Sequence, residues 1–368
     1  MSRLSAISLF SGAGGLDIGV HRAGFDILFA VENDETAIST LTLNRRRYFR
    51  TIDSIEPLDI TKLSPRSVMR SLGLRKGELD LLVGGPPCVA FSKSGFHLDY
   101  KRQGRDPRAA LLSEYFRFLE ALRPQAFIME NVFGLAYKNQ SALFFETLQR
   151  NIVALGYSLT YGILNAADFG VPQNRQRLFI IGRRDGAMLE LPQPTHWGEH
   201  ERRKRPQGVG VLKPHTTAGA VLHGIQATPE DSESVNGKYG HLLPEIPPGG
   251  NYLHFTAHAG HPNPLFKWRS KFWTFLLKLD PDRPASTIQG QPGPYVGPFH
   301  WENRRLRVPE LKRLQSFPDD YAFAGSRRDI QLQIGNSVPP ELARIVASAV
   351  RTQLKSGTLN PGTQPRLF

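Results

Sequence analysis

The single cysteine of the chain, Cys88, follows a short apolar run in the stretch LDLLVGGPPCVAFSKSG. Pro86 and Pro87 restrict the backbone of the turn that precedes it. A lone cysteine is more often a small buried apolar residue than a nucleophile. Here it lies in a predicted loop beside glycine and proline, just after the predicted end of a strand. This position favours a reactive thiol.

Three further groups that could take part in chemistry lie next to predicted strands. Glu130 ends a strand in the stretch AFIMENV, and Arg175 and Arg177 in QNRQR precede another strand. The alternation of side chains along a strand would point the two arginines in the same direction. Sheets of alternating strands and helices bind their ligands at the carboxyl ends of the strands. We therefore expect Cys88, Glu130 and the two arginines to converge on one edge of a sheet.

These residue types suit an addition to an electron-poor ring. Carbon 5 of cytosine cannot attack a methyl donor directly, but a thiolate added to carbon 6 forms an enamine whose carbon 5 is nucleophilic. Glu130 could assist by giving a proton or a strong hydrogen bond to ring nitrogen 3. Arginine would hold the exocyclic oxygen, and its charge would favour the thiolate over the thiol. A base must then remove the proton at carbon 5 so that the thiol can leave.

A glycine-rich turn, FSGAGGLDIG, joins the first predicted strand to the first predicted helix, where backbone amides can approach a ligand. Glu32 ends the second strand, at a place where a carboxylate can bind the two hydroxyls of an adenosine ribose. Asp17 replaces the third glycine of the dinucleotide fingerprint, which disfavours a pyrophosphate and leaves room for S-adenosylmethionine. A purely structural glycine turn is the alternative that these residues alone leave open.

The elements that must position these groups alternate along the first half of the chain. This alternation indicates an α/β fold with a doubly wound, mostly parallel, Rossmann-like sheet. We expect strands at 6–10, 25–31, 80–83, 126–129, 159–164 and 178–181, with helices at 16–23, 109–122, 141–155 and 340–354. After Gly186 the chain is rich in Pro, Gly, His and Arg and loses this pattern. We assign 1–186 and about 328–355 to a catalytic and cofactor-binding domain, 187–327 to a second, smaller irregular domain with a hinge, and 356–368 to a disordered tail.

Composition narrows the class of protein. Lys and Arg exceed Asp and Glu by 46 to 33, and the resulting net charge of +13 favours a polyanionic partner, with nucleic acid as the leading candidate. One cysteine excludes an internal disulfide framework and a thiolate-rich zinc site, and it indicates a reducing cytosol. No apolar run has membrane-spanning length. The histidines His254, His258 and His261 lack a cysteine or acidic partner at ligand spacing, so we expect no metal.

The order of the motifs resembles that of the DNA (cytosine-5)-methyltransferases of bacterial restriction–modification systems. Only the segment from Arg183 to about Asp280 lacks a matching motif, and the target recognition domain of the family occupies that position. The matching stretches are FSGAGG (10–15), END (32–34), LDIT (58–61), GPPCVAFS (85–92), ENV (130–132), QNRQR (173–177), RPASTI (283–288), RLQSFPDDY (313–321) and GNSVPP (335–340).

The resemblance implies a role for each matching residue. Cys88 would be the nucleophile, Glu130 would face ring nitrogen 3, and Arg177, supported by Arg175, would hold the base and the thiolate. The implied cofactor is S-adenosyl-L-methionine. Its implied contacts are Phe10, Ser11, Gly12, Gly14, Gly15, Glu32, Asn33, Asp59, Ile60, Pro86, Leu111, Asn336 and Ser337. Asn33 departs from the large apolar residue that many relatives have there.

The implied substrate is double-stranded DNA, from which the cytosine must be flipped to reach such a pocket. We expect the segment 92–106 to be a mobile lid, with an ordinary solvated loop as the alternative. Its expected DNA contacts are Ser92, Lys93, Ser94, Lys101, Arg102 and Arg105. The implied enzyme is a cytoplasmic, nucleoid-associated monomer, paired in function with a cognate restriction endonuclease.

Three alternatives are weighed against this interpretation. An RNA methyltransferase on the same scaffold would have a compact second domain, whereas the long basic stretch 187–280 favours duplex DNA. A DNA-binding relative without activity would be expected to lose Cys88, Glu130 or Arg177, and all three are present. A nucleotide-dependent oxidoreductase is disfavoured by the missing fingerprint glycine and by the ordered motifs.

Overall fold

The computed structural model describes residues 3–87, 111–132, 139–198, 210–225, 228–230, 233–268 and 272–356. The chain folds into two compact units. The first unit comprises Met1–Asn165, Gln176–Gln193 and Leu342–Phe368, and the second comprises Ala166–Arg175 and Pro194–Glu341.

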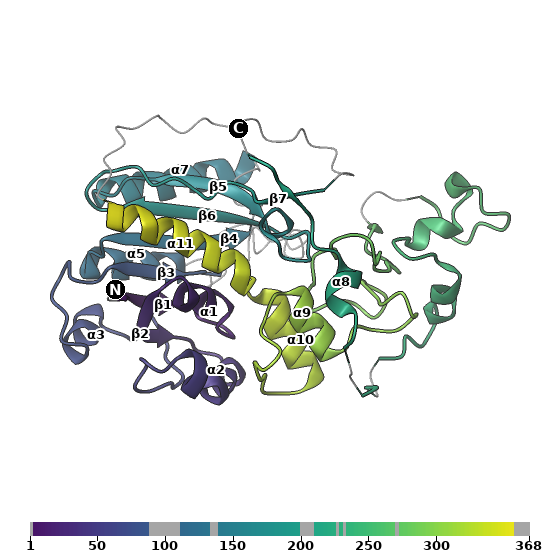
Figure 1. Cartoon of the computed structure of the whole chain (residues 1–368), viewed down its shortest axis with the longest axis horizontal. Helices are drawn as coiled ribbons and strands as arrows, with labels where there is room; N and C mark the ends of the chain where they lie inside the picture. Colours follow the sequence, from purple (N-terminus) through teal and green to yellow (C-terminus); the bar gives the residue numbers. More distant parts are fainter. Residues whose placement is uncertain are drawn as a thin grey trace. The chain divides into compact units, whose positions relative to one another are not determined.

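A six-stranded sheet forms the centre of the first unit, with the strand order β2-β1-β3-β4-β6-β5 (Figure 1). The first four strands in this order are parallel to one another, and β6 is antiparallel to both β4 and β5. The strands are β1 (Leu4–Leu9), β2 (Phe25–Val31), β3 (Leu81–Gly84), β4 (Ala126–Val132), β5 (Thr160–Asn165) and β6 (Gln176–Arg183). The predicted α/β fold with a mostly parallel sheet is confirmed.

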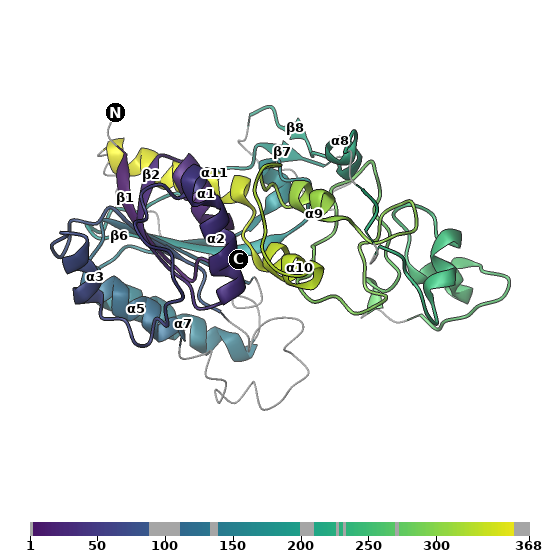
Figure 2. The same ribbon diagram turned by 90° about the horizontal axis from the view of Figure 1, so that it is seen from below.

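Helices cover both faces of this sheet, so the strands are apolar on both sides. Figures 1 and 2 show α1 and α11 on one face and α3, α5 and α7 on the other. The helices of the unit are α1 (Gly15–Arg22), α2 (Glu35–Tyr48), α3 (Pro65–Ser71), α5 (Leu111–Leu122), α7 (Asn139–Ala154) and α11 (Pro340–Ser356). The final helix was predicted at 340–354, and its buried residues recur at the three- and four-residue spacing of one helix face: Leu342, Ala343, Val346, Ala347 and Val350.

One core of the first unit lies between the sheet and the helices α3, α5 and α7. Helix α5 buries Leu112, Phe118 and Leu122 in this core. It also buries Tyr115, whose hydroxyl donates to the carbonyl oxygens of Leu82 (3.3 Å) and Ile128 (3.0 Å). One side chain therefore ties the helix to β3, which precedes the GPPC motif, and to β4, which ends in the ENV motif.

The second unit has little regular structure. Its elements are η3 (Ala166–Phe169), β7 (His196–Trp197), β8 (Lys213–Pro214), α8 (Ala218–Leu222), η4 (Gly240–Glu245), η5 (Tyr252–Phe255), η6 (Ala257–Ala259), α9 (Val308–Leu314) and α10 (Arg327–Asn336). Its described residues form a core around α8, α9 and α10 and another of aliphatic and aromatic residues from 235–299. Within the described residues, no helix is long and apolar enough to cross a membrane.

The boundaries of the two units differ from the expected domain limits. Residues 166–175 were expected in the first domain but belong to the second unit, because Asn174 N donates to Ala285 O (2.8 Å) and Gln173 Nε2 to Leu314 O (3.2 Å). Helix α10 also belongs to the second unit, whereas α11 joins the first from Leu342 onward.

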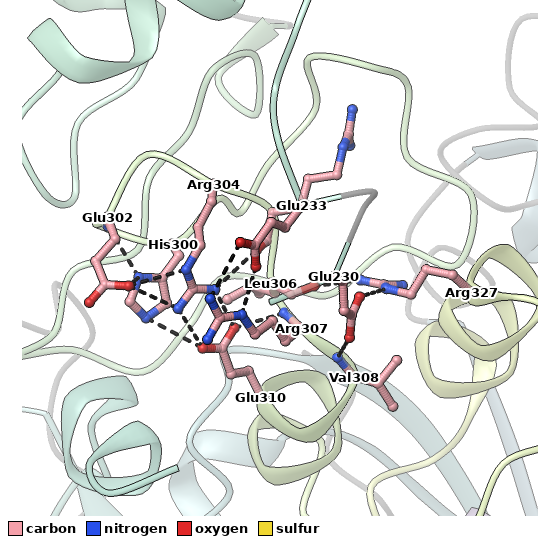
Figure 3. Close-up of polar contacts among 11 residues, drawn as sticks. Glu230, Glu233, His300, Glu302, Arg304, Leu306, Arg307, Val308, Glu310 and Arg327 are labelled. Carbon is pink, nitrogen blue, oxygen red and sulfur yellow. Dashed lines mark hydrogen bonds and ion pairs between the residues drawn. The ribbon is translucent and has the colours of Figure 1, made fainter. Parts of the chain in front are cut away.

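A network of arginines and carboxylates holds the irregular second unit together (Figure 3). Arg304 binds the buried Glu310 with both terminal nitrogens, at 2.9 and 2.8 Å. Arg307 pairs with Glu233 at 2.6 Å. Burial would raise the pKa of Glu310, but the hydrogen bonds from Arg304 and from the Arg307 amide leave that pKa below its usual value. The network therefore links Glu230 and Glu233 to the start of α9 and is a structural feature.

Candidate active site

The carboxyl ends of four parallel strands lie at one edge of the first unit's sheet. The register pairs Leu9 of β1 with Val31 of β2 and with Gly84 of β3. Strand β6 runs in the opposite direction and starts at the same edge, so that Arg177 lies opposite Val132 at the end of β4. Strand β1, with β2 on one side and β3 on the other, marks the point where the strand order reverses, which is the usual ligand position in such sheets.

Glu130 on β4 and Arg177 on β6 form an ion pair at this edge. The Nε atom of Arg177 lies 3.0 Å from Oε1 of Glu130, and both side chains are mostly buried. Burial lowers the pKa of Arg177, and the neighbouring charge of Glu130 raises it. The pair thus places a carboxyl and a cation side by side on two neighbouring strands.

The double glycine before the cysteine motif is explained by close approach of the chain to its neighbours. A Cβ atom on Gly85 would lie 3.0 Å from Oε2 of Glu130, and one on Gly84 would lie 2.6 Å from the carbonyl oxygen of Leu9. Larger residues at these two positions would push the loop away from Glu130 and from β1. The GGPP loop is therefore built to approach Glu130.

Asn131, the residue after Glu130, also holds the GGPP loop. Its Nδ2 atom donates to the carbonyl oxygen of Pro86 at 3.1 Å, and its Oδ1 atom accepts from the backbone N–H of Val132 at 2.8 Å. The side chain is buried. Sequence reasoning quoted Asn131 within the ENV motif but gave it no role. The only available signal was its position directly after Glu130.

The glycine-rich turn after β1 is held in place by Glu32. The Oε2 atom of Glu32 accepts from Gly12 N (2.7 Å), and Oε1 accepts from Asn33 N (2.8 Å) and Asp34 N (2.9 Å). Gly12 and Gly14 have φ angles of 52° and 78°, which L-residues with side chains rarely adopt. Glu32 therefore shapes the turn. The sequence predicted only that Glu32 binds the ribose hydroxyls and did not indicate this second role.

The LDIT motif lies next to Glu32. Leu58 N donates to the carbonyl oxygen of Glu32 at 2.7 Å. The Oδ1 atom of Asp59 accepts from Thr61 Oγ1 (2.7 Å) and from Thr61 N (3.0 Å), and these hydrogen bonds lower the pKa of Asp59. The side chain of Ile60 is buried in the core.

The remaining expected cofactor residues of the first unit surround the same edge. Ser11 N donates to the carbonyl oxygen of Val31 at 3.1 Å, and Gly15 is the first residue of α1. Phe10 and Leu111 are partly buried and pack against the core.

Asp17 is a buried carboxyl group directly after the glycine turn, and its side chain received no functional role from the sequence. It is 1% exposed. Burial raises its pKa from 3.8 to about 7, although the nearby hydroxyls of Ser8 and Ser11 lower it to a smaller extent. Ser11 Oγ donates to Ser8 Oγ at 3.0 Å, and neither oxygen of Asp17 has a hydrogen-bond partner within the described residues.

Arg175 makes its described hydrogen bonds within the second unit. Its guanidinium group is fully buried in the second unit and donates to the carbonyl oxygens of Gly335 (2.6 Å), Ser337 (3.0 Å) and Ile288 (3.2 Å). The expectation that Arg175 supports Arg177 in catalysis stays a prediction, and the hydrogen bonds described for Arg175 lie within the second unit. Arg175 fixes the backbone of the GNS motif. Asn336 in that motif is exposed and Ser337 is partly buried.

Several expected site residues lie outside the described part of the chain. They are Cys88 and the expected DNA contacts Ser92, Lys93, Ser94, Lys101, Arg102 and Arg105.

The family model of C-5 cytosine-specific DNA methylases matches residues 4–352. The chain belongs to this family. Type II methyltransferase M.SacI from Streptomyces achromogenes is 44% identical over 373 residues, which cover 95% of this chain and 93% of the relative. Type II methyltransferase M1.HphI from Haemophilus parahaemolyticus is 34% identical over 361 residues, covering 94% and 86% of the two chains.

Solved structures share the fold of this C-5 cytosine methylase. A putative DNA modification methyltransferase encoded in an E. coli prophage has a TM-score of 0.63 at 24% identity, with 96% of this chain and 99% of that chain covered. The Dnmt2 methyltransferase of S. pombe has a TM-score of 0.63 at 18% identity, with the same coverage.

Family membership establishes the activity. The protein is a DNA (cytosine-5-)-methyltransferase of the type II restriction–modification kind, it acts on DNA, and it uses a methyl donor. The alternative of a nucleotide-dependent oxidoreductase is thereby excluded.

Proposed function

We propose that this methyltransferase transfers a methyl group from S-adenosyl-L-methionine to carbon 5 of a flipped-out cytosine in a specific duplex sequence, through a covalent bond to Cys88. The observation that carries this proposal is the Glu130–Arg177 pair, which lies against Gly85. Cys88 follows Gly85 by three residues. Three peptide steps span at most about 11 Å, so the length of the chain allows the thiol to act beside the pair.

The glycine turn and Glu32 fit the cofactor. A Cβ atom on Gly12 would meet no other atom within 4 Å, so the turn has open space for a ligand on that side. Glu32 uses three acceptor positions on backbone amides, and a carboxylate has about four, which leaves capacity for a ribose hydroxyl. S-adenosyl-L-methionine supplies an electrophilic methyl group on a positively charged sulfur. Asp59, whose pKa is lowered, adds a further acceptor beside Glu32.

The spacing of the strands suits two ligands side by side. Glu32 follows β2 and Glu130 lies on β4, with β1 and β3 between them. Three inter-strand steps span about 14 Å. This separation allows a nucleoside held at β2 and a target base held at β4 to meet above β1 and β3.

The residues of the chain would divide the chemistry as follows. The Cys88 thiolate adds to carbon 6 of cytosine while Glu130 hydrogen-bonds or protonates ring nitrogen 3. Arg177 holds Glu130 in place and stabilises negative charge on the base oxygen and on the thiolate. After methylation, a base removes the proton at carbon 5, the bond between sulfur and carbon 6 breaks, and nitrogen 3 returns its proton.

Recognition of the DNA sequence is assigned to the second unit, as the target recognition domain of the family. Flipping the cytosine out of the duplex is required because the stacked base cannot reach Glu130. The relation to type II methyltransferases supports a functional pairing with a cognate restriction endonuclease. We further propose a monomer in the bacterial cytosol, which needs no metal.

The covalent step is tested with Cys88→Ser. Methyl transfer should become undetectable, because a hydroxyl is far less ionised than a thiol, while calorimetry should give an unchanged cofactor dissociation constant. A duplex with 5-fluorocytosine at the target should trap the wild-type protein covalently, since fluorine cannot leave as a proton. Near wild-type turnover of Cys88→Ser, or absence of the trapped adduct, would exclude the mechanism.

A further inference from the structure

One segment of the second unit exposes an unusual amount of apolar surface. Leu265 (56%), Trp268 (56%), Phe272 (51%) and Trp273 (46%) are all exposed within nine residues of chain. Single exposed apolar residues are ordinary on protein surfaces, but a concentration of them marks an interaction surface. We call the described residues of 254–268 and 272–273 the aromatic segment.

The exposure does not result from a lack of anchoring. Phe266 packs edge-on against Tyr239 at a centroid distance of 5.5 Å and against Phe275 at 5.7 Å. Leu265 N and Phe266 N both donate to the carbonyl oxygen of Phe255, at 2.9 and 3.2 Å. A buried aromatic core therefore carries the segment and leaves its large side chains facing solvent.

Backbone bonds fix the second half of the segment in the same way. Asn251 Nδ2 donates to the carbonyl oxygen of Trp273 at 2.7 Å. Tyr252 N donates to Phe275 O at 3.1 Å, directly after the exposed pair Phe272 and Trp273. The exposed aromatic side chains thus extend from a backbone that is held at several points, which suits a preorganised contact surface.

The charge of this region selects the partner. The sequence from 246 to 279 contains no Asp or Glu, but it contains Lys267, Arg269, Lys271 and Lys278, a balance of four positive charges to none. Lys278 is buried and donates to the carbonyl oxygen of Ile246, whereas Lys267 is exposed. Elsewhere in the same unit, arginines are paired with carboxylates (Figure 3). A second copy of this chain would bring like charges together, so the region fits a polyanion better than itself.

The histidines of the segment belong to the same surface. The ring of His258 lies 6.4 Å from that of Trp268, and the rings of His254 and His261 are 5.8 Å apart. Within the described residues, no group of three or more His, Cys, Asp or Glu side chains could hold a metal ion. His258 is exposed, so its ring adds a polar edge with hydrogen-bonding nitrogens beside Trp268, whereas His254 and His261 are half-buried.

We propose that the aromatic segment is the surface that reads the DNA sequence around the target cytosine. This inference rests on the proposed function of the second unit and names its reading surface. Phosphates are bound by cations, whereas base edges and the methyl group of thymine offer the contacts that suit Trp268, Phe272 and Trp273. Lys267 supplies a cation for the adjacent backbone, and the exposed ring of His258 supplies hydrogen bonds to bases.

The test uses Trp268→Ala and Phe272→Ala in the full chain, with Val211→Ala as the matched control. Val211 lies in the same unit and is 100% exposed. The methylated site is first mapped in the DNA of an expression host by bisulfite sequencing. Dissociation constants are then measured by fluorescence anisotropy for a duplex with this site and for duplexes with one base pair changed.

We define discrimination as the dissociation constant for a changed duplex divided by that for the duplex with the site. Each alanine variant should lower this ratio about tenfold, because one lost base contact is worth about 1–3 kcal/mol. The control, the affinity for S-adenosyl-L-methionine and the far-ultraviolet circular dichroism should not change. An unchanged ratio would overturn the proposal. An equal loss of affinity on all duplexes would also overturn it, since that result indicates backbone binding. Light scattering that showed a wild-type oligomer dissociated by Trp268→Ala would assign the surface to self-association instead.

The outcomes separate this inference from the proposed function. A wild-type protein that did not discriminate between the duplexes would contradict sequence recognition as a whole. Wild-type discrimination that survived both alanine substitutions would contradict only the role of the aromatic segment. Because the measurement is of binding, a failure of the Cys88 mechanism would not affect it.

Discussion

Replacing Asp17 by Asn should stabilise the first unit at neutral and alkaline pH. Burial raises the pKa of Asp17 from 3.8 to about 7. A difference of about three pKa units between the unfolded and folded states corresponds to about 4 kcal/mol. Between these two pKa values the native state binds the proton and the unfolded state does not, so stability falls as pH rises. The loss begins near pH 4 and is complete above about pH 8.

Asn resembles the protonated form of Asp17, so it removes this loss. The free energy of unfolding of Asp17→Asn minus that of wild type should therefore rise by about 4 kcal/mol between pH 4 and pH 8.5. Because Asp17 is 1% exposed, solvent should screen the effect little. Burial of the new amide is a cost common to all pH values, so the slope with pH is the diagnostic quantity.

The assay must report on the first unit. All four tryptophans of the chain lie in the second unit, so tryptophan fluorescence would follow the wrong part. Urea unfolding is monitored by hydrogen exchange of the peptides that cover β1 and α1. This measurement gives the local free energy of unfolding at each pH. Asp53→Asn, which changes an exposed carboxyl group in the same unit, is the matched control and should show no pH-dependent difference. A difference for Asp17→Asn that stayed constant from pH 4 to 8.5 would refute the argument from burial.

Three further predictions test the site and the division of labour between the units. Glu32→Ala should weaken cofactor binding at least about tenfold in calorimetry and leave DNA affinity unchanged, because it removes the acceptor that holds the glycine turn; equal cofactor affinity would contradict this role. Arg175→Lys should lower the stability of the second unit by about 2–5 kcal/mol, measured by tryptophan fluorescence, since lysine has one terminal nitrogen where two separate guanidinium nitrogens reach the three carbonyls. The exposed Arg283→Lys should change this stability little. Exchange of residues 194–341 for the matching segment of a relative should transfer the recognised sequence while cytosine carbon 5 remains the methylated atom; an active chimera that kept the original site would place recognition elsewhere.

The sequence determined the positions of the strands and the edge where the chemistry lies. Apolar runs of strand length predicted all six strands of the sheet to within a few residues, because burial on both faces leaves a continuous local pattern. The ends of these strands then placed Glu32 and Glu130 at one edge without any further information. The order of the motifs identified the family, because motifs are recognised from residue types and need no coordinates.

Tertiary structure alone decided how the polar side chains pair. Arg177 meets Glu130 because β6 is antiparallel to β4, and the direction of a strand is not encoded in its own hydrophobic pattern. Arg175 binds carbonyl oxygens 160 residues further along the chain, at Gly335, a partner that no local periodicity could reveal. Its proximity in sequence to Arg177 suggested only a shared direction along a strand and gave no sign of these backbone contacts within the second unit.

Burial of single groups was also decided by the fold. Asp17 lies in the first turn of a helix, where a carboxylate is ordinarily favoured. Only the packing of that turn removes the Asp17 side chain from water. In the second unit, Phe266 and Trp268 are both large aromatic residues, two positions apart. The first is packed in the aromatic core and the second faces solvent, because an irregular backbone follows neither strand nor helix periodicity. Local pattern fixes secondary structure, whereas contacts between distant segments determine which side chains remain available to a ligand.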